Sequence, residues 1–208
     1  MNDNFFKMVK DWTISDYKTP GIKAEVILDM LISEFIEDLI GYHCREKVTL
    51  LAKEFPIRTN DDNYLNAKVD YLVSTGKKLI LVELKTTPDS YKSEQEIRMK
   101  GAVNDGAEKL IEFYNTICDL KNGNSLDSKK YKYSRQKFNE KAQLEDISDA
   151  DYLYILLKDE KNNVEKNRKI VLEKICADDK FKEHLSDGSK RELWEQVSSI
   201  LLGCANVF

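Results

Sequence analysis

Two short apolar runs separated by a glycine-containing turn constrain the fold of this chain most strongly. The runs span residues 67–73 and 78–87, and the four residues between them read STGK. β-Branched and aromatic residues are frequent in both runs, and such runs on either side of a short turn are typical of a β-hairpin. The sequence therefore predicts two antiparallel strands near the middle of the chain.

Three charged residues interrupt this hairpin where a buried strand normally has none. Asp70 lies in the first arm, and Glu83 and Lys85 lie at the end of the second. If Ser74 pairs with Lys77 across the turn, Asp70 lies diagonal to Glu83. Because side chains alternate along a strand, the three charged groups then share one face, while the other face is wholly apolar and must be turned toward the core.

Two carboxylates on one patch repel each other, and each raises the pKa of the other. A divalent cation between them would resolve this conflict. Mg²⁺ favours carboxylate oxygens, keeps several waters and suits phosphate substrates. It would lower the pKa of a bound water and stabilise charge on a phosphoryl oxygen, and a nearby lysine can orient that water.

The segment with Asp70 in one strand and Glu83-Leu84-Lys85 at the end of the next resembles the motif of the PD-(D/E)XK nuclease superfamily. The resemblance implies Mg²⁺-dependent hydrolysis of phosphodiester bonds, usually in DNA, with Mn²⁺ able to substitute. It assigns Asp70 and Glu83 as metal ligands, joined by the backbone carbonyl of Leu84, and Lys85 as the motif lysine. Val69 stands where the motif has its proline.

The same resemblance implies an α/β fold with a restriction-endonuclease-like core, in which a mixed central sheet is flanked by helices in the order α-β-β-β-α-β. Apolar periodicity along the chain agrees with this order. It predicts a helix over 22–42, a strand over 48–57, the hairpin, a helix over 91–120 broken near 101–106, a strand over 151–158 and charged helices over 164–202. We expect a single domain over 1–208, with a nuclease-like core at 21–158 and a C-terminal helical extension at 159–208.

The tripeptide D/E-x-K alone has little value, because it occurs six times in the chain. Only the copy at Glu83 ends an apolar strand that follows an Asp-bearing hairpin arm. The best decoy is the copy at Asp159, which lies just beyond a predicted strand. One alternative stays open at this point, namely an exposed sheet face with cross-strand ion pairs, in which Lys68 lies opposite Glu83.

Further candidates lie on the flanking helices. Glu25 continues the apolar stripe of the first helix at its N-terminal end, so we expect it to support the metal through a water, with Glu34 as a weaker candidate. The alternative is that Glu25 is a first-turn acid that complements the helix dipole. On the helix after the hairpin, Gln95 and Arg98 are candidates for contact with the nucleic acid, unless they belong to a solvated face.

The polar, lysine-rich stretch over 121–147 predicts a loop or short helices, and within it a basic segment at 129–141 interleaves cations with aromatic rings. Basic groups neutralise phosphates, and aromatic rings can stack on unpaired bases. The alternative is a solvated, lysine-rich loop whose aromatic residues anchor it to the body of the protein. The candidate nucleic-acid contacts in this segment are Lys129, Lys130, Lys132 and Arg135.

Charge and cysteine content limit the partners. The chain has 33 Lys and Arg against 37 Asp and Glu, so a nucleic-acid site must be a local patch. Its four cysteines form no C-x-x-C pair, and we expect reduced, mostly buried thiols in a cytoplasmic protein. No apolar run is long enough to span a membrane.

The sequence thus predicts a metal-dependent nuclease that acts on nucleic acid, with DNA as the first choice of substrate. The alternative is a catalytically inactive protein of the same fold that binds nucleic acid or serves as an assembly module. The pathway, the cleavage pattern and the oligomeric state, a dimer included, do not follow from the sequence.

Overall fold

The computed structural model describes residues 3–18, 24–58, 67–87, 90–120, 126–141, 147–159, 164–185 and 187–207. Residues 19–23, where the predicted first helix begins, lie outside the description, and so does the side chain of the candidate Lys130. The chain divides into two compact units. Unit 1 comprises 1–44, 84–90 and 155–208, and unit 2 comprises 45–83 and 91–154.

Within the described residues, five strands form one sheet in the order β1-β2-β3-β4-β5. The first three are antiparallel neighbours, whereas β4 runs parallel to β3, because Ser148 N donates to Lys77 O and Leu157 N donates to Lys85 O. The fold is therefore α/β with a mixed sheet flanked by helices, as predicted. The strands are β1 (Thr49–Pro56), β2 (Lys68–Ser74), β3 (Lys78–Lys85), β4 (Asp149–Leu156) and β5 (Lys169–Val171).

The hairpin forms, but its register differs from the predicted one. Ser74 pairs with Leu79 instead of Lys77. The cause is a turn displaced by one residue, in which Thr75 N donates to Lys78 O at 3.1 Å and Gly76 takes a φ of +87° that other residues rarely adopt. The shift of two residues leaves every side chain on its predicted face.

The corrected register also changes the partner of Lys68. This residue pairs with Pro56 of β1, and its Nζ lies 3.0 Å from Glu54 Oε2. The arrangement in which Lys68 lies opposite Glu83 is therefore wrong.

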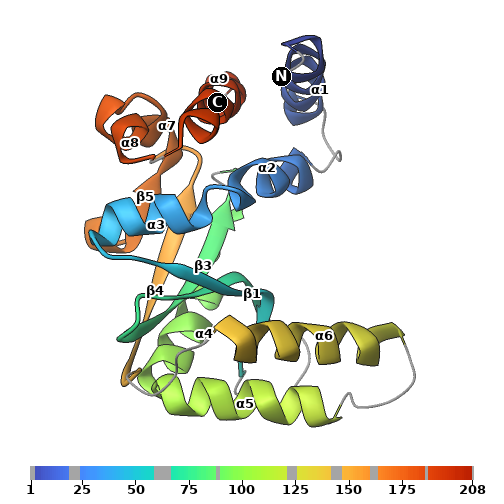
Figure 1. Cartoon of the computed structure of the whole chain (residues 1–208), viewed down its shortest axis with the longest axis vertical. Coiled ribbons are helices and arrows are strands. Elements are labelled where there is room, and N and C mark those ends of the chain that lie inside the picture. Colours follow the sequence, from blue (N-terminus) through green and yellow to red (C-terminus); the bar gives the residue numbers. More distant parts are fainter. Residues whose placement is uncertain are drawn as a thin grey trace. The chain divides into compact units, whose positions relative to one another are not determined.

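Three helices belong to unit 2: α4 (Ser93–Asn104), α5 (Ala107–Leu120) and α6 (Leu126–Lys141). The predicted break between the first two is confirmed, and it falls at Gly106, whose φ is +89°. Helices α5 and α6 lie side by side (Figure 1). Tyr114 joins them to the sheet, because its ring packs against Phe138 of α6 and Phe55 of β1, each with centroids 5.0 Å apart.

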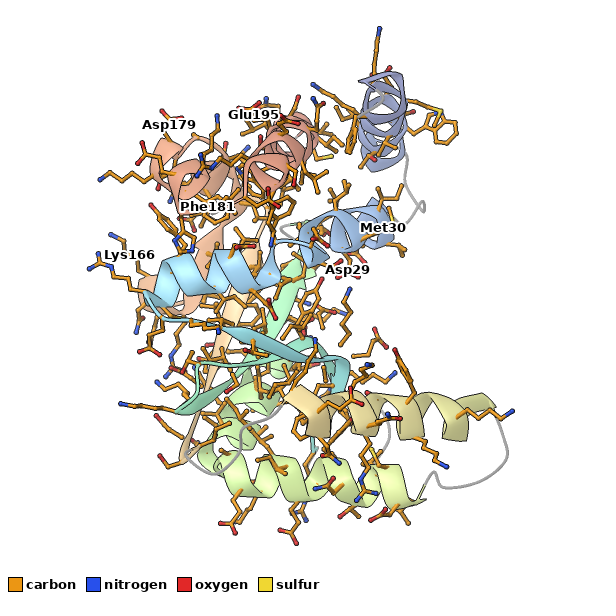
Figure 2. All side chains as sticks on the ribbon, viewed as in Figure 1. Asp29, Met30, Lys166, Asp179, Phe181 and Glu195 are labelled. Atoms are coloured by element: carbon orange, nitrogen blue, oxygen red, sulfur yellow. The ribbon has the colours of Figure 1, made fainter. Side chains whose placement is uncertain are left out.

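Unit 1 has a core of aromatic rings. Trp194 is fully buried, with its ring centroid 4.9 Å from Phe35 and 4.8 Å from Phe181. Figure 2 shows Phe181 turned inward, while Lys166, Asp179 and Glu195 of this unit point outward. The helices of this unit are α1 (Asp3–Lys18), α2 (Ala24–Ser33), α3 (Ile36–Cys44), α7 (Leu172–Cys176), α8 (Asp179–His184) and α9 (Gly188–Ala205).

Two predictions on the N- and C-terminal parts need correction. The single helix predicted at 22–42 is two helices, because Phe35 N bonds to Ile32 O at 2.8 Å and Ser33 Oγ bonds back to Met30 O, which tightens the last turn of α2. The segment at 164–202 is not wholly helical, since it contains the three-residue strand β5 after the 3₁₀ turn η3 (Lys166–Arg168). Such a strand is too short to show a period of two.

The four cysteines are free thiols, as expected, and Cys118, Cys176 and Cys204 are buried. Burial raises the pKa of Cys176 to about 12 and that of Cys204 to about 11, which leaves both thiols protonated and unreactive near neutral pH. In the part of the chain that the structure describes, no helix is both long enough and apolar enough to cross a membrane.

Candidate active site

Asp70 and Glu83 occupy neighbouring strands immediately beyond the last registered pair of the hairpin. That pair is Tyr71 and Val82. Asp70 precedes Tyr71 on β2, and Glu83 follows Val82 on β3, so both lie one residue farther from the turn. Asp70 is half-buried, and Glu83 is 5% exposed. Their face of the sheet also carries fully buried leucines, so it is a covered face and not a solvated one. These leucines are Leu72 and Leu81.

The two carboxylates suit a divalent metal ion in their chemistry. Directly opposed residues of an antiparallel pair have Cβ atoms about 5 Å apart, which allows both carboxylates to reach one ion. Oxygen donors are what Mg²⁺ prefers, and it retains waters when a protein supplies only one or two carboxylates. In the described ranges, no group of three or more His, Cys, Asp or Glu could hold a metal. Asp70 and Glu83 would therefore hold the ion with waters, and the role of the Leu84 carbonyl stays a prediction.

A polar cluster centred on Glu96 lies in the same unit. Glu96 accepts hydrogen bonds from Tyr91 and from Tyr152, the latter at 3.1 Å, and forms a 2.8 Å ion pair with Lys100. Burial alone would raise the pKa of Glu96, but the bonds from Lys100 and the two tyrosines outweigh it and lower that pKa. Glu96 is thus a largely buried carboxylate that stays ionised.

Tyr154 contacts this cluster, and the charge of Glu83 also acts on it. Its ring is 5.5 Å from Tyr91 and 6.2 Å from Tyr152, both measured between centroids. Burial raises the pKa of Tyr154, and the negative charges of Glu96 and Glu83 add to the effect. The hydroxyl therefore keeps its proton and remains a hydrogen-bond donor.

Lys85 is the last residue of β3, two positions after Glu83, and it points to the same face by the alternation of the strand. Its side chain is half-buried. Its backbone carbonyl accepts a hydrogen bond from Leu157 N at 3.0 Å, which fixes this end of the strand against the segment after β4. The fixed backbone sets the direction in which the side chain of Lys85 leaves the strand.

Glu25 lies beside the end of β3. Its Oε1 accepts a hydrogen bond from the hydroxyl of Thr86 at 3.3 Å, and Thr86 directly follows Lys85. Glu25 is exposed and stands in the first turn of α2, so it also fits the alternative of a dipole-complementing acid. Glu34 lies in the turn between α2 and α3 and is exposed, as is Glu37.

On helix α4, Gln95 and Glu96 are both half-buried, and Arg98 is exposed. Glu96, whose side chain is 13% exposed, is the residue that carries the polar cluster. Sequence reasoning missed Glu96. The available signal was the i,i+4 spacing of Glu96 and Lys100, which is typical of a helical ion pair, next to a tyrosine at the start of the helix.

The basic segment forms one helix, α6, and not a loop. Phe138 is buried and anchors the helix to the body of unit 2, as the alternative interpretation of this segment expected. Arg135 is paired with Asp119 at 2.5 Å, which weakens its candidacy for a phosphate contact. In contrast, Lys129 and Lys132 are exposed, and Tyr133 is 63% exposed, so these side chains stay candidates for contact with a nucleic acid.

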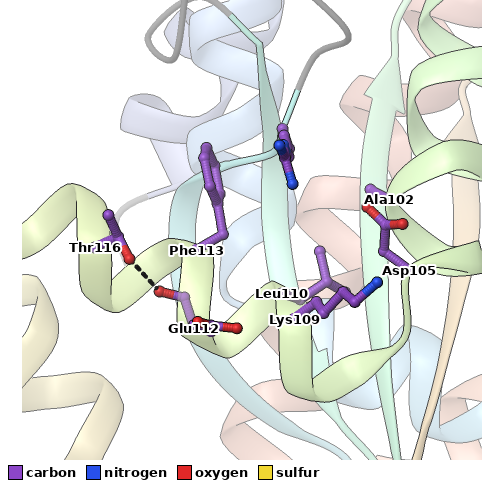
Figure 3. A pocket seen from close by; sticks show the side chains of 8 residues that line it. Ala102, Asp105, Lys109, Leu110, Glu112, Phe113 and Thr116 are labelled. Atoms are coloured by element: carbon purple, nitrogen blue, oxygen red, sulfur yellow. Dashed lines mark hydrogen bonds between the residues drawn. The ribbon is translucent and has the colours of Figure 1, made fainter. Parts of the chain in front are cut away.

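A separate surface pocket of about 280 Å³ lies along α5 (Figure 3). It contains none of the predicted site residues. Its charges nearly cancel, because Arg58 and Lys109 stand with Asp105 and Glu112. Such a pocket lacks the single sign of charge that would favour a nucleic-acid backbone.

Asp159, which begins the decoy copy of the D/E-x-K tripeptide, forms structural ion pairs. Its carboxylate lies 2.8 Å from Lys169 Nζ and 2.9 Å from Lys174 Nζ. These hydrogen bonds lower the pKa of Asp159 to about 2. Asp159 therefore joins β5 and α7 to the end of β4.

No family model, no curated protein and no solved structure matches this chain. The function must therefore be inferred from the site itself. Two features of that site bear on it: the carboxylates of Asp70 and Glu83, and the position of Lys85 on the same strand as Glu83. The exposed cations of α6 are a separate feature.

Proposed function

We propose that this protein is a metal-dependent nuclease that hydrolyses phosphodiester bonds, with DNA as the preferred substrate. The observation that carries the proposal is the placement of Asp70 and Glu83 at neighbouring positions on a covered sheet face. Two carboxylates so placed cost free energy unless a cation or hydrogen bonds compensate them. A divalent ion compensates both at once.

The succession of elements supports a restriction-endonuclease-like core. Helix α3 is followed by β1, β2, β3, α4 and β4, with α5 and α6 inserted before the last strand. This is the order α-β-β-β-α-β that the resemblance to the PD-(D/E)XK superfamily implies. Asp70 lies on β2, and Glu83 and Lys85 lie toward the end of β3, which also supports the proposal.

Each residue of the proposed site has a distinct role. Bound Mg²⁺ would lower the pKa of an attacking water and offset charge on the scissile phosphate. Asp70 and Glu83 would hold the ion, and Lys85 would orient the water or stabilise the developing charge. A compact ammonium suits this role because it is a strong point charge. Glu25, which is bonded to Thr86 next to Lys85, is the candidate acid of the first helix.

The exposed face of α6 offers contacts for the nucleic-acid backbone. Lys129 and Lys132 are exposed on this helix, and each phosphate that they neutralise would release counterions. Tyr133 adds an exposed ring on the same helix, on which an unpaired base can stack. The acidic net charge of −4 confines such binding to this local patch.

Cleavage assays test the proposal. Supercoiled plasmid, double-stranded and single-stranded DNA and single-stranded RNA are incubated with the protein in EDTA, Mg²⁺ or Mn²⁺. We expect cleavage only with metal, and its loss in Asp70→Asn and Glu83→Gln. Asp159→Asn is the matched control, because it alters the decoy motif, and it should cleave at the wild-type rate. Absence of cleavage of all four substrates in both metals would contradict the nuclease proposal, and binding without cleavage would favour an inactive nucleic-acid-binding protein.

A further inference from the structure

The hydroxyl of Tyr154 is a buried donor that forms no hydrogen bond within the part of the chain that the structure describes. Its side chain is 0% exposed. Buried polar groups are nearly always paired, because an unpaired one loses its bonds to water without replacement. A phenylalanine would fill the same space without this cost, so the hydroxyl calls for a partner that the described polypeptide does not supply.

The strand pairing places Tyr154 at the level of Glu83. In a parallel pair, the amide of one residue bonds to the carbonyl of the residue before its opposed neighbour, so the bond from Leu157 N to Lys85 O, two residues from Glu83, places residues that are 71 apart opposite each other. The same offset of 71 takes Glu83 to Tyr154. The negative charge of Glu83 is one of the influences that raise the pKa of Tyr154, which agrees with this proximity.

The hydroxyls of the neighbouring residues Tyr91 and Tyr152 already have a hydrogen-bond partner. Both Tyr91 and Tyr152 donate their hydroxyl to Glu96, and Lys100 completes the set around that carboxylate. The rings of Tyr91 and Tyr152 in turn flank Tyr154. These contacts fix the ring of Tyr154 while leaving its hydroxyl available, which is what a positioning group requires.

We propose that Tyr154 is a positioning residue, whose hydroxyl donates a hydrogen bond to a water or phosphate oxygen held beside Glu83. This inference rests on the proposed metal site at Asp70 and Glu83. The hydroxyl is a neutral donor, so it orients an oxygen without competing with the metal for the carboxylates. It would stabilise the metal-loaded state, because it gains its missing partner only there.

Thermal melting at increasing Mn²⁺ concentration tests the proposal without any substrate. The variant is Tyr154→Phe, and the matched control is Tyr152→Phe on the same strand. In EDTA, Tyr154→Phe should be as stable as the wild type or more stable, because it removes an unsatisfied hydroxyl. Tyr152→Phe should be less stable, because Glu96 loses a donor.

The dependence of the melting temperature on Mn²⁺ concentration separates the proposed role of Tyr154 from the structural role of Tyr152. We expect the apparent dissociation constant for Mn²⁺ to rise about 3- to 10-fold in Tyr154→Phe, as the loss of one hydrogen bond implies, and to stay unchanged in Tyr152→Phe. The Asp70→Asn variant shows how much of the rise in melting temperature that Mn²⁺ causes in the wild type comes from binding at Asp70 and Glu83. Equal Mn²⁺ affinity in Tyr154→Phe and the wild type would overturn the positioning role alone, as would an equal loss in both tyrosine variants. A wild-type protein that Mn²⁺ does not stabilise would overturn this role together with the metal site.

Discussion

Asp70 of β2 and Glu83 of β3 lie next to the paired residues Tyr71 and Val82, on the side away from the turn. This relationship places one carboxylate from each strand on the same covered face of the sheet. The next residues toward the turn on that face are the fully buried Leu72 and Leu81, so the two carboxylates border an apolar surface. The proposed metal site depends on this one relationship.

Lys85→Ala should reduce cleavage at least about 100-fold while changing Mn²⁺ affinity less than about 2-fold, because the lysine acts on the water and is not a ligand. Lys85→Arg should restore little activity, since a planar guanidinium places its charge differently from a compact ammonium. Cleavage rates and Mn²⁺ titrations measure the two effects. Near-wild-type cleavage by Lys85→Ala would rule out the proposed role.

Glu25→Gln should lower activity more than Glu34→Gln or Glu37→Gln. The reason is position, because Glu25 bonds to Thr86 next to Lys85, whereas Glu34 lies in the turn that separates α2 from α3. The three single variants are compared by cleavage rate at saturating Mg²⁺. A more severe effect of Glu34→Gln would show that the wrong carboxylate of this helical segment had been assigned.

The exposed lysines of α6 should set the salt dependence of DNA binding. In Lys129→Ala/Lys132→Ala, the slope of log K against log salt should fall by about 0.7–0.9 for each phosphate that the protein no longer neutralises. Lys166→Ala/Lys180→Ala is a control with the same change in net charge, on exposed lysines elsewhere in the chain. Fluorescence anisotropy at several salt concentrations gives the slopes, and equal slopes in the two double variants would mean that α6 only contributes a solvated face.

Asp159 should affect stability and not catalysis. Its pKa in the folded protein is about 2, below the ordinary 3.8, because Lys169 and Lys174 bond to it. A lowered pKa stabilises the folded state above pH ~4, and this contribution disappears as the pH falls through about 2. Since Lys174 and part of Asp159 are exposed, we expect Asp159→Asn to lose about 1 kcal/mol at pH 7 and almost nothing at pH 2.

Urea unfolding of wild type and Asp159→Asn between pH 7 and pH 2 measures this difference. A loss that is the same at all pH values would point to an effect of the substitution other than the ion pairs. Cleavage activity at pH 7 should match the wild type in the same preparation.

The sequence was sufficient for those elements whose side-chain period is strong. The hairpin, the strand that became β4 and the glycine break between α4 and α5 were predicted from apolar periodicity and turn residues. The faces of the hairpin were also predicted correctly, because a register error of two residues preserves the alternation. The pairing of Ser74 was predicted wrongly, because the placement of a turn depends on backbone hydrogen bonds such as the one from Thr75 N to Lys78 O.

The parts that could not be predicted depend on contacts between distant segments. The spacing of Glu96 and Lys100 indicates a helical ion pair, but it does not show that Glu96 also bonds to Tyr152, which is 56 residues away. The pairing of Asp159 with Lys169 and Lys174 likewise requires β5, which is too short to predict. The continuous helix at 126–141 was missed because the segment has no apolar stripe and is anchored through Phe138.

The most direct test of the central claim is a set of thermal melts of wild type and Asp70→Asn, each in EDTA and in millimolar Mn²⁺. If Asp70 and Glu83 bind one ion, Mn²⁺ should raise the wild-type melting temperature, and Asp70→Asn should lose most of this rise. In EDTA, Asp70→Asn should be as stable as the wild type or more stable, because one of two like charges is removed. A variant that is less stable in EDTA, together with a wild type whose melting temperature does not respond to Mn²⁺, would contradict the metal site and the nuclease function inferred from it.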